Sequence, residues 1–164
     1  MIRFDSILAG ADFDDASATA LAYGRSPARA FGARLYVLHV VDDVKGTMAA
    51  AFHPDTFEDM QVHVEKGARH RLDALLTHGD RETLHATAVV RVSSAIPNTI
   101  VEYARTAHVD LIIVGTHGRG VVSRVLLGSV AEKVVRTAPC PVLVVRPDEH
   151  DFIVPEPIGV QTHL

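Results

Sequence analysis

The sequence has little of what marks a secreted, membrane-bound or nucleic-acid-binding protein. Its 164 residues contain one cysteine, Cys140, which cannot form an internal disulfide, and this usage fits a reduced, intracellular environment. No apolar stretch approaches the roughly 20 residues that span a bilayer, and Arg3 and Asp5 interrupt the first apolar residues, unlike a secretory signal. The formal net charge of -4 gives no overall attraction to nucleic acid or anionic lipid. We expect a cytoplasmic protein whose partners are small molecules or proteins, with no nucleic acid and no membrane among them.

Familiar catalytic and metal-binding motifs are absent as well. The glycines between 115 and 120 are not followed by the Gly-Lys-Ser/Thr of a P-loop, and their spacing is not that of a dinucleotide-binding loop. There is no His-Glu-x-x-His motif and no cysteine pair. His63, His70 and His78 are two helical turns apart, about 10 Å, which is too far for them to share one ion. We expect no intrinsic metal site and assign no catalytic residue.

The chain does contain a regular alternation of short apolar runs and helical patterns. Runs rich in Val, Ile and Leu predict five strands, at Ile2–Ala9, Arg34–Val41, His85–Val92, Asp110–Gly115 and Pro141–Val145. Strands that are almost continuously apolar and separated by helices indicate a parallel sheet covered on both faces. The prediction is one α/β domain over residues 1–146, followed by a tail, 147–164, whose apolar positions suggest packing on a partner subunit.

The first two helical segments have clear boundary signals. Residues 14–31 begin at Asp14, an expected N-cap, and contain Pro27, which favours a kink or a split. The second segment, about 54–78, has apolar residues at helical spacing and Gly79 as its expected stop. Its charged residues, Arg71 among them, are expected to form a solvated face.

The last two helical segments are shorter. One begins near Pro97 and the other at Ser129, and Pro139 ends the second. The side chains expected to face the core are Ile100, Val101, Ala104, Val130, Val134 and Val135. Cys140, between two prolines at a strand start, is expected to be a small core residue, and His39 a structural one.

The stretch from Gly115 to Ser129 is the most informative part of the chain. It follows the apolar run 109–114, is rich in glycine and leads into a helix, an arrangement that lets backbone N–H groups and a helix N-terminus approach phosphate. Ligands of parallel sheets bind at the carboxyl ends of the strands. With the first and fourth strands adjacent, the loops 10–14 and 115–129 face each other there, and we expect a nucleotide between them.

The glycine spacing is G-x2-G-x9-G-[ST], satisfied by Gly115, Gly118, Gly128 and Ser129. With its flanks this pattern resembles the universal stress protein family. The resemblance covers nearly the whole chain, in the blocks Ile7–Phe13, Leu38–Asp42 and Asp110–Pro147. It implies an open five-stranded parallel sheet of order 3-2-1-4-5 with helices on both faces, which is the adenine nucleotide α-hydrolase-like fold.

The resemblance also implies a ligand and a set of binding residues. Family members that keep this glycine pattern resemble ATP binders, with Mg²⁺ expected to arrive on the phosphates. Asp12 is then expected at the adenosine end and Val40 to hold the base through its backbone. The residues carried over by position are Gly10, Ala11, Asp12, Val40, Val114, Gly115, Gly118, Gly128, Ser129 and Val130. We add Arg119 and Arg124, because guanidinium groups can grip phosphate oxygens.

One departure from the family concerns the first loop. The chain has Gly10-Ala11-Asp12 where the family usually shows Pro-Thr-Asp, which removes a rigid ring and a hydroxyl from the adenosine side. A looser base pocket is the expected consequence.

Three functions are compatible with these features. The first is a regulatory ATP-binding stress-response protein whose nucleotide occupancy modulates a homodimer, formed through Val142 and Val144 of the last strand, or an unknown protein partner. The second is a slow Mg²⁺-dependent ATPase, which ranks lower because no P-loop lysine and no convincing base for water are present. The third is a nucleotide-free dimeric interaction protein, which the complete glycine pattern opposes.

Overall fold

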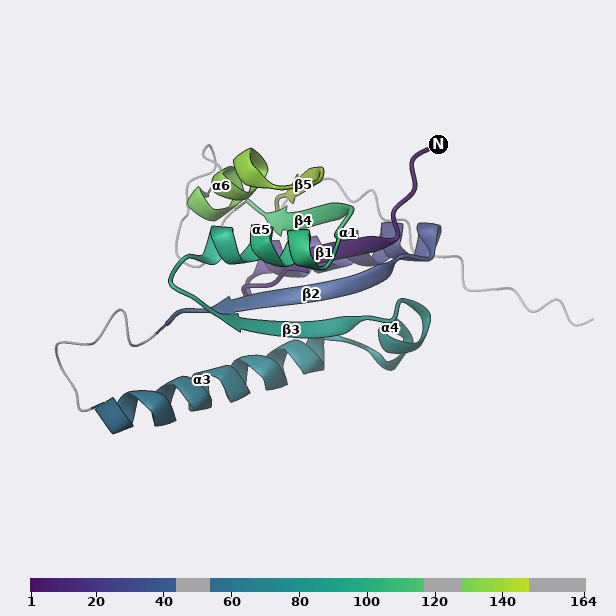
Figure 1. Ribbon diagram of the computed structural model, residues 1–164. Helices are drawn as coiled ribbons and strands as arrows, with labels where there is room; N and C mark the ends of the chain where they lie inside the picture. Colours follow the sequence, from purple (N-terminus) through teal and green to yellow (C-terminus); the bar gives the residue numbers. More distant parts are fainter. Residues whose placement is uncertain (44–53, 117–127, 148–164) are drawn as a thin grey trace, which may run out of the picture.

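A five-stranded parallel sheet forms the centre of the computed structural model, which describes residues 1–43, 54–116 and 128–147 (Figure 1). The strands are β1 (Ser6–Gly10), β2 (Arg34–Val41), β3 (Thr87–Val92), β4 (Leu111–Gly115) and β5 (Val142–Val145). Their order is β3-β2-β1-β4-β5, and all four pairings are parallel. The predicted α/β fold is therefore confirmed. The predicted tail lies outside the described residues from 148 onward.

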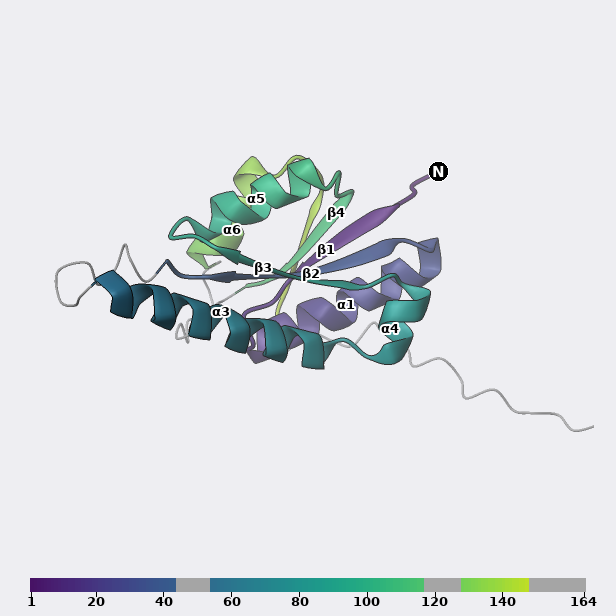
Figure 2. The same cartoon turned by 60° about the horizontal axis from the view of Figure 1, so that its bottom comes forward.

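Helices cover both faces of the sheet, as Figure 2 shows. On one face lie α1 (Asp15–Phe31), α3 (Pro54–Leu75) and the short α4 (His78–Thr83), and on the other α5 (Ile96–Thr106) and α6 (Ser129–Thr137). Neighbouring strand residues point to opposite faces, so Ile7 packs in the core beneath α1 while Leu8 packs in the core beneath α5 and α6. Both side chains are fully buried, which explains why the strands carry almost no polar residues.

Four strands begin later than the apolar runs predict, β4 and β5 by one residue and β1 and β3 by more. β1 starts at Ser6 rather than at Ile2, because the amides of Asp5 and Ser6 donate to Oδ2 of Asp110 at 2.8 and 2.9 Å. The Asp110 carboxylate thus fixes the first backbone amides of β1, and Ile2, before the strand, is exposed. β3 starts at Thr87, because His85 has a positive φ of 46° that is incompatible with a strand.

Most helix expectations are confirmed at the level of single residues. Asp14 caps α1, accepting from the amide of Ser17 at 2.7 Å, and the helix is not split at Pro27. The core-facing residues predicted for α5, Ile100, Val101 and Ala104, are all buried. In α6, Val134 is fully buried, as predicted. Val135 is 47% exposed, so the prediction that it faces the core was wrong. Each residue turns the helix by about 100°, and Ala131 takes the core-facing position instead.

The predicted stop at Gly79 was also wrong. α3 ends at Leu75, and Gly79 lies inside α4, whose N-cap is Thr77. The Thr77 hydroxyl accepts from the amide of Asp80 at 3.1 Å, and Oδ2 of Asp80 accepts from the amide of Thr77 at 2.9 Å. This capping box starts a new helix where the local pattern indicates an end. Within the described parts of the chain, no helix is long and apolar enough to cross a membrane.

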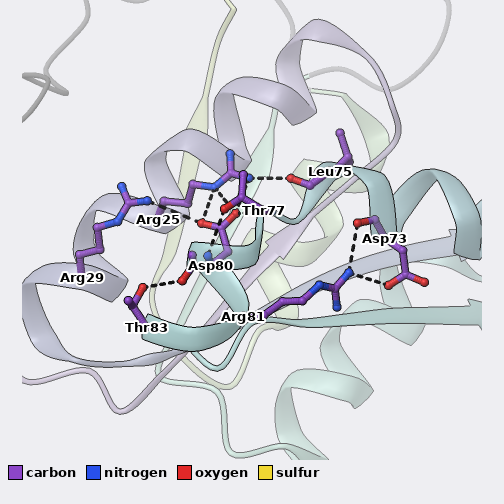
Figure 3. A network of polar contacts seen from close by, with 9 residues as sticks. Arg25, Arg29, Asp73, Leu75, Thr77, Asp80, Arg81 and Thr83 are labelled. Carbon is purple, nitrogen blue, oxygen red and sulfur yellow. Dashed lines mark hydrogen bonds and ion pairs between the residues drawn. The ribbon is translucent and has the colours of Figure 1, made fainter.

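Asp80 also joins α1 to the turn between α3 and α4 (Figure 3). Its side chain is fully buried and accepts from Nη2 of Arg25 at 2.8 Å, with Arg29 a second cation at 3.6 Å. Arg25 donates further to the carbonyl of Leu75, at the end of α3, at 2.7 Å. Burial opposes ionisation of Asp80, but the hydrogen bonds from Arg25 and Thr77 outweigh it and lower the pKa of this carboxyl.

Replacing Asp80 with Asn tests how much this charge stabilises the fold. Asn keeps an acceptor for Thr77 but leaves Arg25, 23% exposed, without its anion, so we expect a loss of about 1–3 kcal/mol in unfolding free energy at pH 7. Because the pKa of Asp80 is lower in the folded state, its stabilisation is present above the unfolded value near pH 4 and is lost as pH falls through the folded value. Urea unfolding of both proteins between pH 7 and pH 3 measures this.

The matched control is Asp73→Asn. Asp73 pairs with Arg81 at 3.0 Å, but both side chains are more than two-fifths exposed, so its loss is expected to cost less than about 1 kcal/mol. Equal destabilisation by the two substitutions, or a gap between wild type and Asp80→Asn that does not narrow between pH 7 and pH 3, would contradict this account.

Candidate functional site

A cavity of about 690 Å³ opens at the carboxyl ends of β1, β2 and β4, within the size range of small-molecule sites. It lies at the switch point of the sheet, where the chain connects outward from β1 in both directions. Its walls come from residues 10–14, 38–42, 114–116 and 128–131 together with α3 and α5. The two loops expected to face each other therefore do so in their described parts.

The structure gathers the predicted binding residues around this one cavity. Those that it describes all line the cavity: Gly10, Ala11, Asp12, Val40, Val114, Gly115, Gly128, Ser129 and Val130. The remaining three, Gly118, Arg119 and Arg124, lie outside the described residues. Contact of each residue with a nucleotide stays a prediction.

The start of α6 forms one end of the cavity. Gly128 is the N-cap and makes no side-chain cap hydrogen bond, while Ser129 and Val130 line the cavity. The first N–H groups of a helix have no acceptor within it, and they give this end a partial positive charge. α1 begins near the same cavity but is already capped by the carboxylate of Asp14. Of these two helix starts, α6 is the one suited to an anion.

Sequence reasoning missed the wall that α3 contributes. His63, Gly67 and Arg71, spaced four residues apart on one side of this helix, line the cavity. Arg71 is therefore not simply part of a solvated face, as expected, since its guanidinium carbon lies 3.9 Å from the centre of the Phe13 ring. A glycine between a histidine and an arginine at this spacing was the available signal. No group of three or more potential metal ligands occurs in residues 1–43, 54–116 and 128–147.

Comparison with known proteins decides the family. The sequence model of the universal stress protein family matches residues 3–146. The chain belongs to the universal stress protein family. A universal stress protein of Thermus aquaticus is 34% identical over 144 residues, covering 87% of this chain and 99% of that protein.

Solved structures of the family share this fold. A universal stress protein in complex with cAMP is 24% identical, with a TM-score of 0.55, and the match covers 89% of this chain and 99% of that one. The universal stress protein of Archaeoglobus fulgidus in complex with dAMP is 20% identical, with a TM-score of 0.57, and the match covers 88% and 98%. At these identities the likeness extends to the fold alone.

Within this universal stress protein, Gly115 has a structural role that the motif does not indicate. A Cβ at this position would lie 2.7 Å from Cβ and 3.1 Å from the carbonyl carbon of Ala16 in the first turn of α1. Real side chains do not approach this closely, so only glycine lets β4 and α1 meet here. Gly10 is also confined, since its Cβ would lie 3.2 Å from Cγ1 of Val114.

Cys140 and His39 occupy the structural positions expected of them. Cys140 is half-buried against the core beneath α5 and α6, and burial, with a smaller effect of Asp110, raises the pKa of its thiol, which keeps it protonated and unreactive. His39 is buried, and its Nδ1 lies 2.6 Å from the carbonyl of Ala11. It also lines the cavity, so this core residue is adjacent to any ligand.

Gly115→Ala tests whether glycine is needed at 115 for the fold itself. We expect a loss of about 1–3 kcal/mol in unfolding free energy without nucleotide, because the methyl group must push β4 away from Ala16. Gly67→Ala is the control: its Cβ would meet nothing within 4 Å, and alanine in a helix interior should stabilise by about 0.5–1 kcal/mol. Urea unfolding measures both, and an unchanged Gly115→Ala protein would leave ligand contact as the reason for this glycine.

Proposed function

We propose that this chain binds adenine nucleotides, with ATP and Mg²⁺ as the principal ligand, and that occupancy regulates a homodimer or a protein partner in the stress response. The observation that carries the proposal is that one cavity has both an apolar wall and the start of α6, where the N-cap Gly128 makes no side-chain hydrogen bond. The ligands of the two family structures, cAMP and dAMP, are adenine nucleotides and support this assignment of ligand class.

The base and ribose fit the side of the cavity between β2, β4 and α5. Val40, Val114 and Ile100 line it there and belong to the same apolar cluster, a surface suited to a planar base. Asp12 lies on the same cavity wall as Gly10 and Ala11, where a carboxylate can accept from ribose hydroxyls. This end of the cavity would select the adenosine part of the ligand.

The phosphates fit the start of α6. The N–H groups at Ser129 and Val130 and the Ser129 hydroxyl supply donors without a lysine. Mg²⁺ needs oxygen ligands and takes most of them from phosphate and water. The Ser129 hydroxyl, which lines the cavity at the proposed phosphate end, would supply an added ligand.

A chain of backbone hydrogen bonds connects the phosphate end to the last strand. The amide of Gly128 donates to the carbonyl of Thr116 at 2.7 Å, and the amide of Thr116 donates to the carbonyl of Val145 in β5 at 2.8 Å. Among the described strands β5 lies at the edge of the sheet and pairs with β4. A ligand that shifts the start of α6 would therefore act on the strand through which we propose dimerisation, provided the two dimer states differ in nucleotide affinity.

Ser129→Asp tests the position of the phosphates. Isothermal titration of the wild-type protein should detect ATP, and the variant should bind ATP at least about tenfold more weakly, because a carboxylate then faces the phosphates. Adenosine should bind both proteins equally, since it carries no phosphate. An aspartate at a helix start also favours the helix, so the variant should remain folded.

Two outcomes of this titration would contradict the proposal. Equal losses for ATP and adenosine would mean that the phosphates do not lie at α6. Absence of binding of ATP, ADP and AMP to the wild-type protein at millimolar concentration would remove nucleotide binding altogether.

Leu143→Lys tests the dimer. Val142 and Val144 are half-buried against α6, whereas Leu143 is 38% exposed on β5, and a charge on an edge strand opposes strand-to-strand association. Sedimentation should give a dimer for the wild type and a monomer for the variant. Val92→Lys on β3, the opposite edge, is the control, since Val92 is 37% exposed. A dissociation constant of the dimer that ATP leaves unchanged would remove the regulatory part of the proposal.

A further inference from the structure

The N–H and the carbonyl of Ala11 both bond to residues of β2 and so hold the loop after β1. The amide of Ala11 donates to the carbonyl of Leu38 at 2.8 Å, and Nδ1 of His39 lies 2.6 Å from the carbonyl of Ala11. A carbonyl can only accept, so the His39 proton must be on Nδ1. Ala11 and His39 are both 7% exposed, which protects the two bonds from water.

Two positions further on, the loop adopts an unfavourable backbone conformation. Phe13 has a φ of +61°, a region that L residues avoid because Cβ crowds the backbone. The conformation turns the chain from the strand into the capping box that Asp14 and Ser17 form at the start of α1. Such a conformation persists only where its surroundings stabilise it.

The Phe13 ring contacts two other side chains. The His39 ring lies near it, with centroids 4.5 Å apart and planes at 49°. The guanidinium group of Arg71 lies 3.9 Å from the ring centre, a favourable cation–π contact. Arg71 belongs to α3, which packs on β2 and β3, so the contact connects this helix with the loop after β1.

Asp12 lies between the two restrained residues of this loop. Ala11 before it is bonded to β2, and the Phe13 ring after it contacts His39 and Arg71. The loop has no proline to stiffen it, since residues 10–14 are Gly-Ala-Asp-Phe-Asp. Ordering a flexible loop only when the ligand arrives would weaken binding.

We propose, on the basis of the nucleotide-binding function proposed above, that Arg71, Phe13 and His39 are positioning residues that hold Asp12 ready for the adenosine part of the ligand. They act through the loop backbone and replace the stiffness that a proline would supply. The looser base pocket expected from the sequence stays a prediction, while the contacts from β2 and α3 bear on the loop beside it.

Amide hydrogen exchange of the nucleotide-free protein tests the restraint directly. Arg71 is exposed, so Arg71→Met should raise exchange at residues 12–14 by about two- to fivefold, the scale of one cation–π contact at an exposed site. Lys66→Met is the control, because it removes an exposed cation from α3 outside the cavity wall. Phe13→Asn, which tolerates positive φ but lacks the ring, should behave like Arg71→Met, whereas Phe13→Tyr should keep the slow exchange.

Titration of the same variants then separates positioning from direct contact. Because adenosine and ATP share the part that Asp12 would meet, Arg71→Met should weaken both by the same factor. A loss for ATP alone, with unchanged exchange, would make Arg71 a phosphate ligand and overturn the positioning role. If the wild type binds no nucleotide, the proposed function fails, and the exchange data still decide whether the three side chains restrain the loop. Unchanged exchange in both Arg71→Met and Phe13→Asn would refute the restraint.

Discussion

The candidate site depends on the close contact between Gly115 at the end of β4 and Ala16 in the first turn of α1. A Cβ at 115 would lie 2.7 Å from that of Ala16, so the missing side chain allows the helix to begin directly over the strand. This contact brings the loop after β1 and the segment after β4 to the same point of the sheet. The cavity opens between them, and its size follows from how closely these elements approach.

The two helix starts at this cavity are chemically different, and the difference determines at which end of the cavity an anion is favoured. The start of α1 is occupied by Asp14 in a capping box, with Asp15 next to it, so its dipole is already satisfied by negative charge. The start of α6 has Gly128 as its cap, and no cap side chain bonds to its amides among the described residues. An anion is favoured at α6 and disfavoured near α1, and the nucleotide orientation that we propose, with phosphates toward Ser129 and base toward Val40, follows this difference.

A third wall is supplied by α3, whose position is set by charges far from the cavity. Asp80 accepts from Arg25 of α1, and Arg25 also donates to the carbonyl of Leu75 at the end of α3 (Figure 3). Arg71 lies one turn before Leu75 and contacts Phe13. The buried carboxylate therefore anchors the helix that contacts the loop after β1, so the stability of the fold and the geometry of this loop both depend on α3.

The sequence alone determined the properties that neighbouring residues control. Apolar runs buried on both faces predicted the parallel strands, and Asp14 and Pro97 marked helix starts, because burial patterns and caps are local effects. The glycine spacing led to the family and to the residues that line the cavity in its described parts.

The tertiary structure alone decided features that depend on residues far apart in the chain. Asp110 binds the amides at the start of β1, Asp80 pairs with Arg25 and begins α4 where Gly79 indicates a stop, and Arg71 meets Phe13. Local preferences do not encode these contacts. Each residue could pair with several others in the chain, and only the folded sheet brings these partners together.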